Sequence, residues 1–326
     1  MSSVPGVEKR PSVYDQYVTT LEPRYREKAR LELHEDDNTR GPALAQMREF
    51  IAKHPQIIRC RTDSVFLLRF LRSQKFNVLA AQRMLEKWLE AGHLGYEFFV
   101  EIDPYRLEPL IDRNIVVPLG ADNQGRLVLV TRLGRFDSKT TSPEEQTRLI
   151  SLSLETYLDT EIYQVTGLVI IFDFQDATMA HFGIWTIPKL KVIINALNDI
   201  LAFRIKEIHS VQLPKFATMI ADFCIAGLSE KLQRRIKFHK TIDDLKNEID
   251  ESVLPTIYGG KRSLEDANEE FRKRAFQERN RLLKQAEMYI DLSIPSPNGK
   301  NSSRGVLQRE ISEESVVGSF RHLNVD

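Results

Sequence analysis

The chain contains 326 residues, of which 42% are hydrophobic and 28% are charged, enough to build the core of one large domain or two smaller ones. Its 46 Lys and Arg residues balance 46 Asp and Glu residues, so no overall field draws it onto nucleic acid or an anionic membrane. The two cysteines give no basis for a disulfide framework, which indicates a reducing cytosol. The N-terminus lacks the apolar core of a signal peptide, and no stretch approaches the roughly 20 apolar residues of a membrane span.

A polar arm and a small helical domain are predicted at the N-terminal end. Residues 1–22 are expected to form the arm, and residues 23–100 the helical domain. Asp63 and Asn77 are suitable helix caps, and apolar residues recur at helical spacing after each of them. The helices are expected at 23–33, at 42–54, after Asp63 and after Asn77.

From about Arg113, strand-like and helix-like segments alternate. A short turn at 122–125 joins the first two strands, which are therefore expected to pair as a hairpin. The expected elements are strands at 115–117 and 127–130, a helix at 142–165, a strand at 167–174, a helix at 187–202, a strand at 205–211, a helix at 215–234, a strand at 236–239 and a helix at 242–250. This alternation predicts an α/β layer with a partly parallel sheet, in a domain spanning 101–275.

The C-terminal part of the chain carries little core-forming sequence. A highly charged helical segment is expected from about 264 to 291, and its last part, 276–291, extends beyond the α/β domain. Residues 292–326 are rich in Ser with Asn, Pro and Gly, a composition that predicts a disordered tail.

Two features of the α/β part indicate what kind of ligand it binds. The segments around 167–173 and 203–209, and those between and after them, contain more Ile, Leu, Phe and Met than a plain helical cover needs, which suggests an apolar cavity. The only concentrated charge beside them is positive. An apolar cavity next to an anion-binding edge is what a soluble carrier of a membrane lipid needs.

Two pairs of cations make up the positive charge. Arg204 and Lys206 are two apart in a strand-like segment and project to one side. Lys231 and Arg235 are four apart in a predicted helix and share a face. A phosphate site is favoured over a solvated charged face, because the pairs come from separate elements that the fold brings together. Charge-assisted hydrogen bonds contribute roughly 1.5–3 kcal/mol each, so four cations suffice for a multiply charged headgroup.

Several motifs occur in a characteristic order. Phe66-Leu-Leu-Arg-Phe-Leu-Arg72 is followed by Lys75-Phe76, Ile171-Phe-Asp173, Ile208-His209 and Leu254-Pro-Thr-Ile-Tyr-Gly-Gly260. In this order and spacing the chain resembles the CRAL-TRIO (Sec14-like) lipid-binding family over about residues 25–275. Residues 27–51 are similar to the animal branch that contains the retinaldehyde-binding protein, α-tocopherol transfer protein and the clavesins. The resemblance implies a mixed α/β fold, with an N-terminal helical bundle followed by a Sec14-like α/β/α lipid-binding domain that has a mobile gate helix.

The resemblance also implies where a lipid is held, since in this family the sheet forms the floor of a lipid pocket and a mobile helix forms its gate. The pocket residues carried over by position are Ile150, Ser151, Leu154, Leu168, Ile170, Phe172, Ile193, Ala196, Leu197 and Phe203. The gate is expected in the helix after Pro214. Its residues at i, i+3, i+4 and i+7 are Phe216, Met219, Ile220 and Phe223.

The cations Arg204, Lys206, Lys231 and Arg235 match the positions that grip a phosphoinositide headgroup in the tocopherol-carrier branch. We therefore expect a cytosolic carrier that binds one retinoid, tocopherol or related lipid and exchanges it at phosphoinositide-bearing membranes, where it is transiently peripheral. Its partners are expected to be this hydrophobic ligand and that membrane surface, without nucleic acid, and the chain is expected to be a monomer. The alternative is a phosphoinositide-binding trafficking or scaffold protein of the clavesin type, with a vestigial pocket.

Sequence signatures of enzymes are missing. The chain has no Gly-x-Ser-x-Gly elbow, no His-Glu-x-x-His, no phosphate-binding Gly-x-x-x-x-Gly-Lys-Ser/Thr and no Gly-x-Gly-x-x-Gly. His181, His209 and His239 lack a spacing that favours a metal. No catalytic residue, metal or cofactor is therefore expected besides the bound lipid. The sequence does not name that lipid, because an apolar lining accepts retinoids, tocopherols and phospholipid chains alike.

Overall fold

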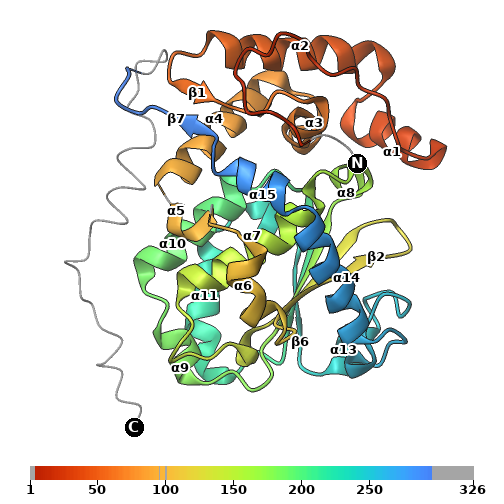
Figure 1. Ribbon diagram of the computed structural model, residues 1–326. Coiled ribbons are helices and arrows are strands. Elements are labelled where there is room, and N and C mark those ends of the chain that lie inside the picture. Colours follow the sequence, from red (N-terminus) through yellow and green to blue (C-terminus); the bar gives the residue numbers. More distant parts are fainter. Residues whose placement is uncertain (1–3, 95, 100, 296–326) are drawn as a thin grey trace.

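The structure, a computed structural model, describes residues 4–94, 96–99 and 101–295. Figure 1 shows the N-terminal helices packed on one end of a sheet that carries helices on its faces. This arrangement confirms the predicted mixed α/β fold with an N-terminal helical bundle. The predicted tail, residues 292–326, lies outside the described residues from 296 onward.

Two of the helices in the N-terminal part begin at the predicted caps, Asp63 and Asn77. The bounds of the helices in this part, with those of one short strand, are α1 Pro23–Leu33, α2 Asp37–Lys53, β1 Ile57–Arg59, α3 Ser64–Ser73 and α4 Val78–Leu94. Asp63 caps α3 and Asn77 caps α4, each by accepting a hydrogen bond from the backbone N–H three residues further on. Helix α2 begins before residue 42, because Asp36 provides a capping box at its start.

The arm before α1 is attached to the folded part. The carboxylate of Asp15 accepts a hydrogen bond from the backbone N–H of Ser64 at 3.0 Å and pairs with Arg48 at 2.8 Å. The hydroxyl of Tyr17 accepts from Arg72 at 3.0 Å and donates to Glu161. These contacts hold the second half of the arm against both the bundle and the α/β part.

The central sheet has five strands in the order β2–β3–β4–β5–β6. Their bounds are β2 Val116–Ala121, β3 Leu127–Arg132, β4 Leu168–Asp173, β5 Ile205–Val211 and β6 Ile236–His239. Strands β2 and β3 pair antiparallel as the expected hairpin, and all further pairs are parallel. The sheet is therefore partly parallel, as the alternation of elements predicts.

Alternating side chains of the strands build two cores. On β4, Leu168 and Ile170 face the core under α7, whereas Val169 and Ile171 face the core that α13 covers. The remaining helices of the fold are α5 Tyr96–Phe99, α6 Pro104–Ile111, α7 Pro143–Leu158, α8 Glu161–Thr166, α9 Met179–Gly183, α10 Ile187–Asn195, α11 Thr218–Gly227, α12 Glu230–Gln233, α13 Ile242–Lys246, α14 Leu264–Gln277 and α15 Arg279–Gln285. Helices thus cover both faces of the sheet. On one of these faces a cavity can lie between the sheet and the helices.

Two long helices expected from the sequence are interrupted. The helix expected at 142–165 is α7 followed by α8, and the chain leaves the helix at Asp159, whose carboxylate is drawn into a buried ion-pair network. The charged segment expected at 264–291 is α14, α15 and a short strand, β7 Tyr289–Ile290, which pairs antiparallel with β1. The C-terminal extension is therefore fastened to the N-terminal bundle.

The helices on the cavity side are interrupted too. The helix expected at 187–202 is α10 followed by a π-helical turn, Ala196–Ile200. The helix expected at 215–234 consists of a 3₁₀ turn, Lys215–Ala217, then α11 and α12. Helix α11 ends at Gly227, a weak helix former, and Ser229 at the N-cap position starts α12.

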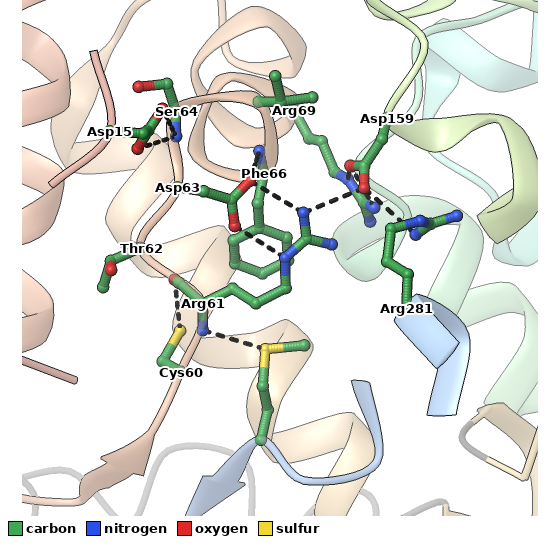
Figure 2. Close-up of polar contacts among 12 residues, drawn as sticks. Asp15, Cys60, Arg61, Thr62, Asp63, Ser64, Phe66, Arg69, Asp159 and Arg281 are labelled. Atoms are coloured by element: carbon green, nitrogen blue, oxygen red, sulfur yellow. Dashed lines mark hydrogen bonds and ion pairs between the residues drawn. The ribbon is translucent and has the colours of Figure 1, made fainter. Parts of the chain in front are cut away.

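A buried network of arginines and carboxylates joins the bundle to the α/β part (Figure 2). The guanidinium groups of Arg61 and Arg69 pair with Asp159 at 3.0 and 2.6 Å, and Arg281 pairs with it at 3.2 Å. Burial alone would raise the pKa of the Asp159 carboxyl, but the three positive charges outweigh burial and hold that pKa far below its usual range. Asp159 is therefore ionised near neutral pH.

A second group of this kind surrounds Arg72, whose side chain is fully buried. Arg72 pairs with Glu35 of the bundle and with Glu161 of α8, each at 2.8 Å, and donates to the side chain of Gln164 at 2.8 Å. Both Arg69 and Arg72 lie off the apolar stripe of α3, yet they are buried because the α/β part supplies the carboxylates.

We expect Asp159→Asn to lower the free energy of unfolding by about 3–5 kcal/mol, because it leaves buried guanidinium groups without their shared countercharge. Chemical denaturation followed by circular dichroism measures this change. The matched control is Glu49→Gln, which removes an exposed pair with Lys53 and should leave the stability close to that of the parent. Equal stability of Asp159→Asn and the parent would show that the network does not hold the two parts together.

Candidate functional site

The cavity floor consists of two rows of side chains that the strand register places side by side. In each row, neighbouring strands contribute residues paired in register, all on one face of the sheet. The first row is Leu129, Ile170, Ile208 and Ile236, and the second is Thr131, Phe172, Ser210 and Phe238. The floor is therefore apolar apart from two hydroxyl groups, which lie on either side of Phe172.

Helices from three regions close the cavity above this floor. Helix α7 contributes Ile150, Ser151 and Leu154, and α10 with its π turn contributes Ile193, Ala196 and Leu197. From the N-terminal bundle, α4 contributes residues at its C-terminal end, beginning with Trp88 and Leu89. The enclosed volume is about 600 Å³, within the range of roughly 300–1,000 Å³ that is typical of small-molecule sites.

Eight of the ten expected pocket residues line this cavity, and Leu168 and Phe203 do not. Leu168 belongs to the row before the floor, where it pairs with Leu127 and Ile205, and all three are buried in the protein core. Phe203 is buried in the same core. The prediction that Leu168 and Phe203 line the cavity is therefore wrong. The protein core fills the space at the start of β4, so the cavity begins one row further along the strand.

The expected gate stripe also requires a correction. Of its four residues only Ile220 lines the cavity, whereas Phe216, Met219 and Phe223 are 43%, 64% and 38% exposed. The other α11 residues that line the cavity are Ala221, Cys224 and Ile225. Helix α11 is apolar on two faces. The residues at i, i+3, i+4 and i+7, which were expected to form the gate, lie mainly on the outward face.

We call Phe216, Met219 and Phe223 the outer gate face. Phe216 packs edge-on against Phe182 of α9, with ring centroids 5.6 Å apart, and Met179 on the same helix is 64% exposed. A group of large exposed apolar side chains on adjacent elements is typical of a surface that meets a membrane or another protein.

The C-terminal end of α11 is held by one side chain. The amide of Asn198, in the π turn, donates to the carbonyl of Gly227 at 2.9 Å and accepts from the backbone N–H of Ser229 at 2.8 Å. Gly227 lies close to Ile194, so that a Cβ there would meet the Ile194 side chain at 3.0 Å. The gate helix is thus fixed to α10 at this end, next to the start of α12.

The four expected cations lie near one another, and we call them the basic cluster. Arg204 and Lys206 both donate to Glu32 of α1, at 2.8 and 3.1 Å. The guanidinium of Arg235 donates to the backbone carbonyl between them. Burial lowers the pKa of Lys231, and the nearby positive charges, Arg235 first among them, lower it further. The two expected pairs therefore form one group, although α12 ends at Gln233 and leaves Arg235 outside the helix.

Local backbone geometry brings Arg204 and Lys206 to the same side. The register between β4 and β5 shifts at this point: Leu168 pairs with Ile205 and the next residue pairs with Glu207, so Lys206 is bulged out of register. Gly167 makes room for this arrangement with φ +99°, and a Cβ there would meet the Arg204 carbonyl oxygen at 2.3 Å.

The histidines identified in the sequence have no obvious catalytic geometry. His209 Nδ1 lies 2.9 Å from His239 Nε2, and its Nε2 lies 3.0 Å from Glu207. Burial lowers the pKa of His209 to about 4, so its ring is neutral near pH 7. In the described ranges, no three His, Cys, Asp or Glu side chains are placed to hold a metal ion. Burial raises the pKa of the Cys224 thiol to about 11, which makes it a poor nucleophile.

Some residues of the site carry no signal in the local sequence. Trp88 and Leu89 belong to the bundle, and Met288 and Tyr289 to the C-terminal extension, yet all four line the cavity. Glu32, which pairs with the basic cluster, lies more than 170 residues before Arg204. Only the tertiary packing brings these residues to the site.

Comparisons with known proteins agree with this geometry. Residues 112–260 match the CRAL/TRIO domain. Clavesin-2 of Homo sapiens is 31% identical over 244 residues, which cover 74% of this chain and 75% of that protein, and Clavesin-1 of Xenopus laevis is 30% identical with 74% of each chain covered. The chain belongs to the CRAL-TRIO family.

The predicted family is thus confirmed, and this CRAL-TRIO protein is a member of a lipid-binding family. The crystal structure of Sfh5 has the same fold, with a TM-score of 0.50 at 12% identity over 80% of this chain and 99% of Sfh5. Within the described residues, no helix combines the length and apolar character needed to cross a bilayer.

We expect Ala196→Trp to fill part of the cavity of this CRAL-TRIO protein and to lower its affinity for a hydrophobic ligand roughly tenfold, with the fold preserved. Native mass spectrometry of the purified protein measures the fraction of chains that carry a ligand. Leu168→Trp is the control: its site is packed solid, so it should instead lower the free energy of unfolding by about 1–3 kcal/mol. Undiminished loading of Ala196→Trp would place the ligand elsewhere.

Proposed function

We propose that this protein carries one hydrophobic molecule, such as a retinoid, a tocopherol or a related lipid, and exchanges it in the cytosol at membranes that bear phosphoinositides. The observation that carries this proposal is the apolar cavity of about 600 Å³, which lies between the sheet and a helix, α11, that is apolar on both faces. One apolar face of α11 closes the cavity and the other is exposed to the outside. Such a helix can leave the cavity for a bilayer without exposing its side chains to water.

The energetics of a carrier fit this arrangement. A lipid that buries about 400 Å² of apolar surface in the cavity gains roughly 10 kcal/mol relative to water, at 25 cal/mol per Å². It gains a comparable amount in the bilayer, so transfer between the two is nearly balanced. Smaller contributions from the headgroup site and the gate can therefore set the direction of transfer.

The basic cluster supports a polyphosphorylated membrane target. Lys231 and Arg235 have pKa values lowered by burial and by neighbouring positive charges, and in the described part of the chain neither pairs with a carboxylate. Positive charges that repel one another in the free protein are stabilised when an anion binds between them. A headgroup with several phosphates supplies that charge.

A scaffold or trafficking function is the alternative. The similarity to clavesins over about three quarters of their length is consistent with it. Extraction of lipid from the purified protein separates the two. Stoichiometric hydrophobic ligand supports the carrier, whereas an empty cavity with intact headgroup binding supports the scaffold.

We expect Lys231→Gln to raise the dissociation constant for vesicles that contain a phosphatidylinositol bisphosphate roughly tenfold, because one charge-assisted hydrogen bond is lost. Vesicle co-sedimentation at two salt concentrations measures this, and added salt should weaken binding of the parent. Lys53→Gln on the bundle is the matched control with the same change in net charge, and it should bind like the parent. Equal binding of the parent to neutral and to phosphoinositide-containing vesicles would refute the headgroup site.

We expect Phe216→Asp combined with Phe223→Asp to slow delivery of a fluorescent ligand to vesicles roughly tenfold, the factor that about 1.4 kcal/mol of lost contact with the bilayer represents. Both side chains are exposed, so the fold should not be affected. Leu79→Asp is the control, since Leu79 is 67% exposed on α4, away from the gate. If the double variant delivers ligand as fast as the parent, the outer gate face does not meet the membrane.

A further inference from the structure

One carboxylate occupies the site at which the headgroup phosphates are proposed to bind. Glu32 Oε2 accepts hydrogen bonds from Arg204 at 2.8 Å and from Lys206 at 3.1 Å, and Glu32 Oε1 lies 3.8 Å from Lys28 one turn earlier in α1. Burial alone would raise the pKa of Glu32, but the hydrogen bonds from Arg204 and Lys206 outweigh it and hold the pKa at about 2. Glu32 is therefore ionised throughout the physiological range.

The charges around Glu32 are unevenly distributed. Glu32 pairs with the two cations at the start of β5, while Lys231 and Arg235, on the other side of the group, pair with no carboxylate in the described part of the chain. Lys75, in the turn after α3, lies close enough to lower the pKa of Lys231. Glu32 thus offsets one of the four positive charges of the basic cluster, and the remaining charge is open to an external anion.

We propose that Glu32 is an internal competitor of the headgroup, displaced from Arg204 and Lys206 when a polyphosphorylated lipid binds, and that it sets the affinity that a headgroup must reach in order to bind. This inference rests on the proposed function. A carboxylate and a phosphate accept hydrogen bonds from the same N–H groups, and one guanidinium nitrogen of Arg204 already donates to the carbonyl of Val165. A phosphate that takes the N–H groups now bonded to Glu32 must replace it.

The consequence for a headgroup follows from the balance of charge. A singly charged headgroup that displaces Glu32 replaces one negative charge by another and gains little. A headgroup with two phosphates replaces Glu32 at Arg204 and Lys206 and also neutralises Lys231 and Arg235. The cost of displacing Glu32 is the same for every headgroup, so only the more highly charged headgroup retains a clear net gain.

A structural role is the competing explanation, in which Glu32 serves only to hold α1 on β5. Since the Glu32 side chain is 38% exposed, its loss as an anchor would cost little, and would change stability without raising the affinity for anionic lipids. Affinity for anionic headgroups is therefore the decisive measurement.

The test uses Glu32→Gln in the full chain, with phosphatidylcholine vesicles that contain either phosphatidylserine or a phosphatidylinositol bisphosphate at equal total lipid charge. We expect affinity for the bisphosphate vesicles to rise roughly tenfold and affinity for the phosphatidylserine vesicles to rise by no more than that, because the cost of displacing Glu32 is removed for both. Glu27→Gln removes an exposed carboxylate from the same helix with the same change in net charge, and should leave both affinities unchanged.

Two further arms make the outcome decisive. Glu32→Asp keeps the charge at shorter reach and should raise the affinity less than Glu32→Gln. Soluble inositol trisphosphate, titrated by calorimetry without vesicles, should bind Glu32→Gln more tightly than the parent. If only vesicle binding changes, the effect is general surface attraction and the inference is wrong.

Failure of this inference differs from failure of the proposed function. If Lys231→Gln weakens binding to the bisphosphate vesicles but Glu32→Gln leaves both affinities as in the parent, the headgroup site stands and internal competition is refuted. If the parent does not distinguish bisphosphate vesicles from neutral ones, the proposed headgroup site itself fails.

Discussion

The rest of the structure depends on the buried arginines of the bundle and the carboxylates that they meet in the α/β part. Arg61, Arg69 and Arg72 lie in α3 or just before it, and all three are buried. The bundle itself supplies carboxylates to Arg61 and Arg72, and the α/β part adds Asp159 and Glu161. Buried ion pairs add little net stability, but a missing partner costs several kcal/mol, so the two parts can pack together in essentially one way.

That single packing arrangement determines the cavity. Helix α7 ends at Leu158, one residue before the carboxylate that binds three arginines, and its Leu154 and Ile150 line the cavity one and two turns earlier. The same contact places the end of α4, with Trp88 and Leu89, over the opposite side of the cavity. The bundle is therefore part of the cavity wall, although no cavity residue was expected from it.

How much could be predicted from the sequence depended on whether a local pattern had one physical reading. Alternation of strand-like and helix-like segments has one reading, so the hairpin and the partly parallel sheet could be predicted. The expected pocket residues came from the family resemblance, and eight of the ten line the cavity. Helix α11 is apolar on two faces, and its spacing alone could not decide which face is buried. The break at Asp159, the bulge at Lys206 and the position of Glu32 arise from contacts distant in sequence, which no window of residues contains.

The gate and the basic cluster share a short stretch of chain, and this sets the conditions for coupling between them. Asn198 holds the end of α11 beside Ser229, and Lys231 follows two residues later in α12. A headgroup bound at Lys231 can favour the open gate only if it binds the open form more tightly than the closed one. In the proposed exchange at a membrane, the outer gate face is exposed before α11 moves, so a bilayer can contact it first. Movement of α11 would then have to expose only the inner face around Ile220 and Cys224, and a bilayer already in contact with the helix would receive those side chains at little cost.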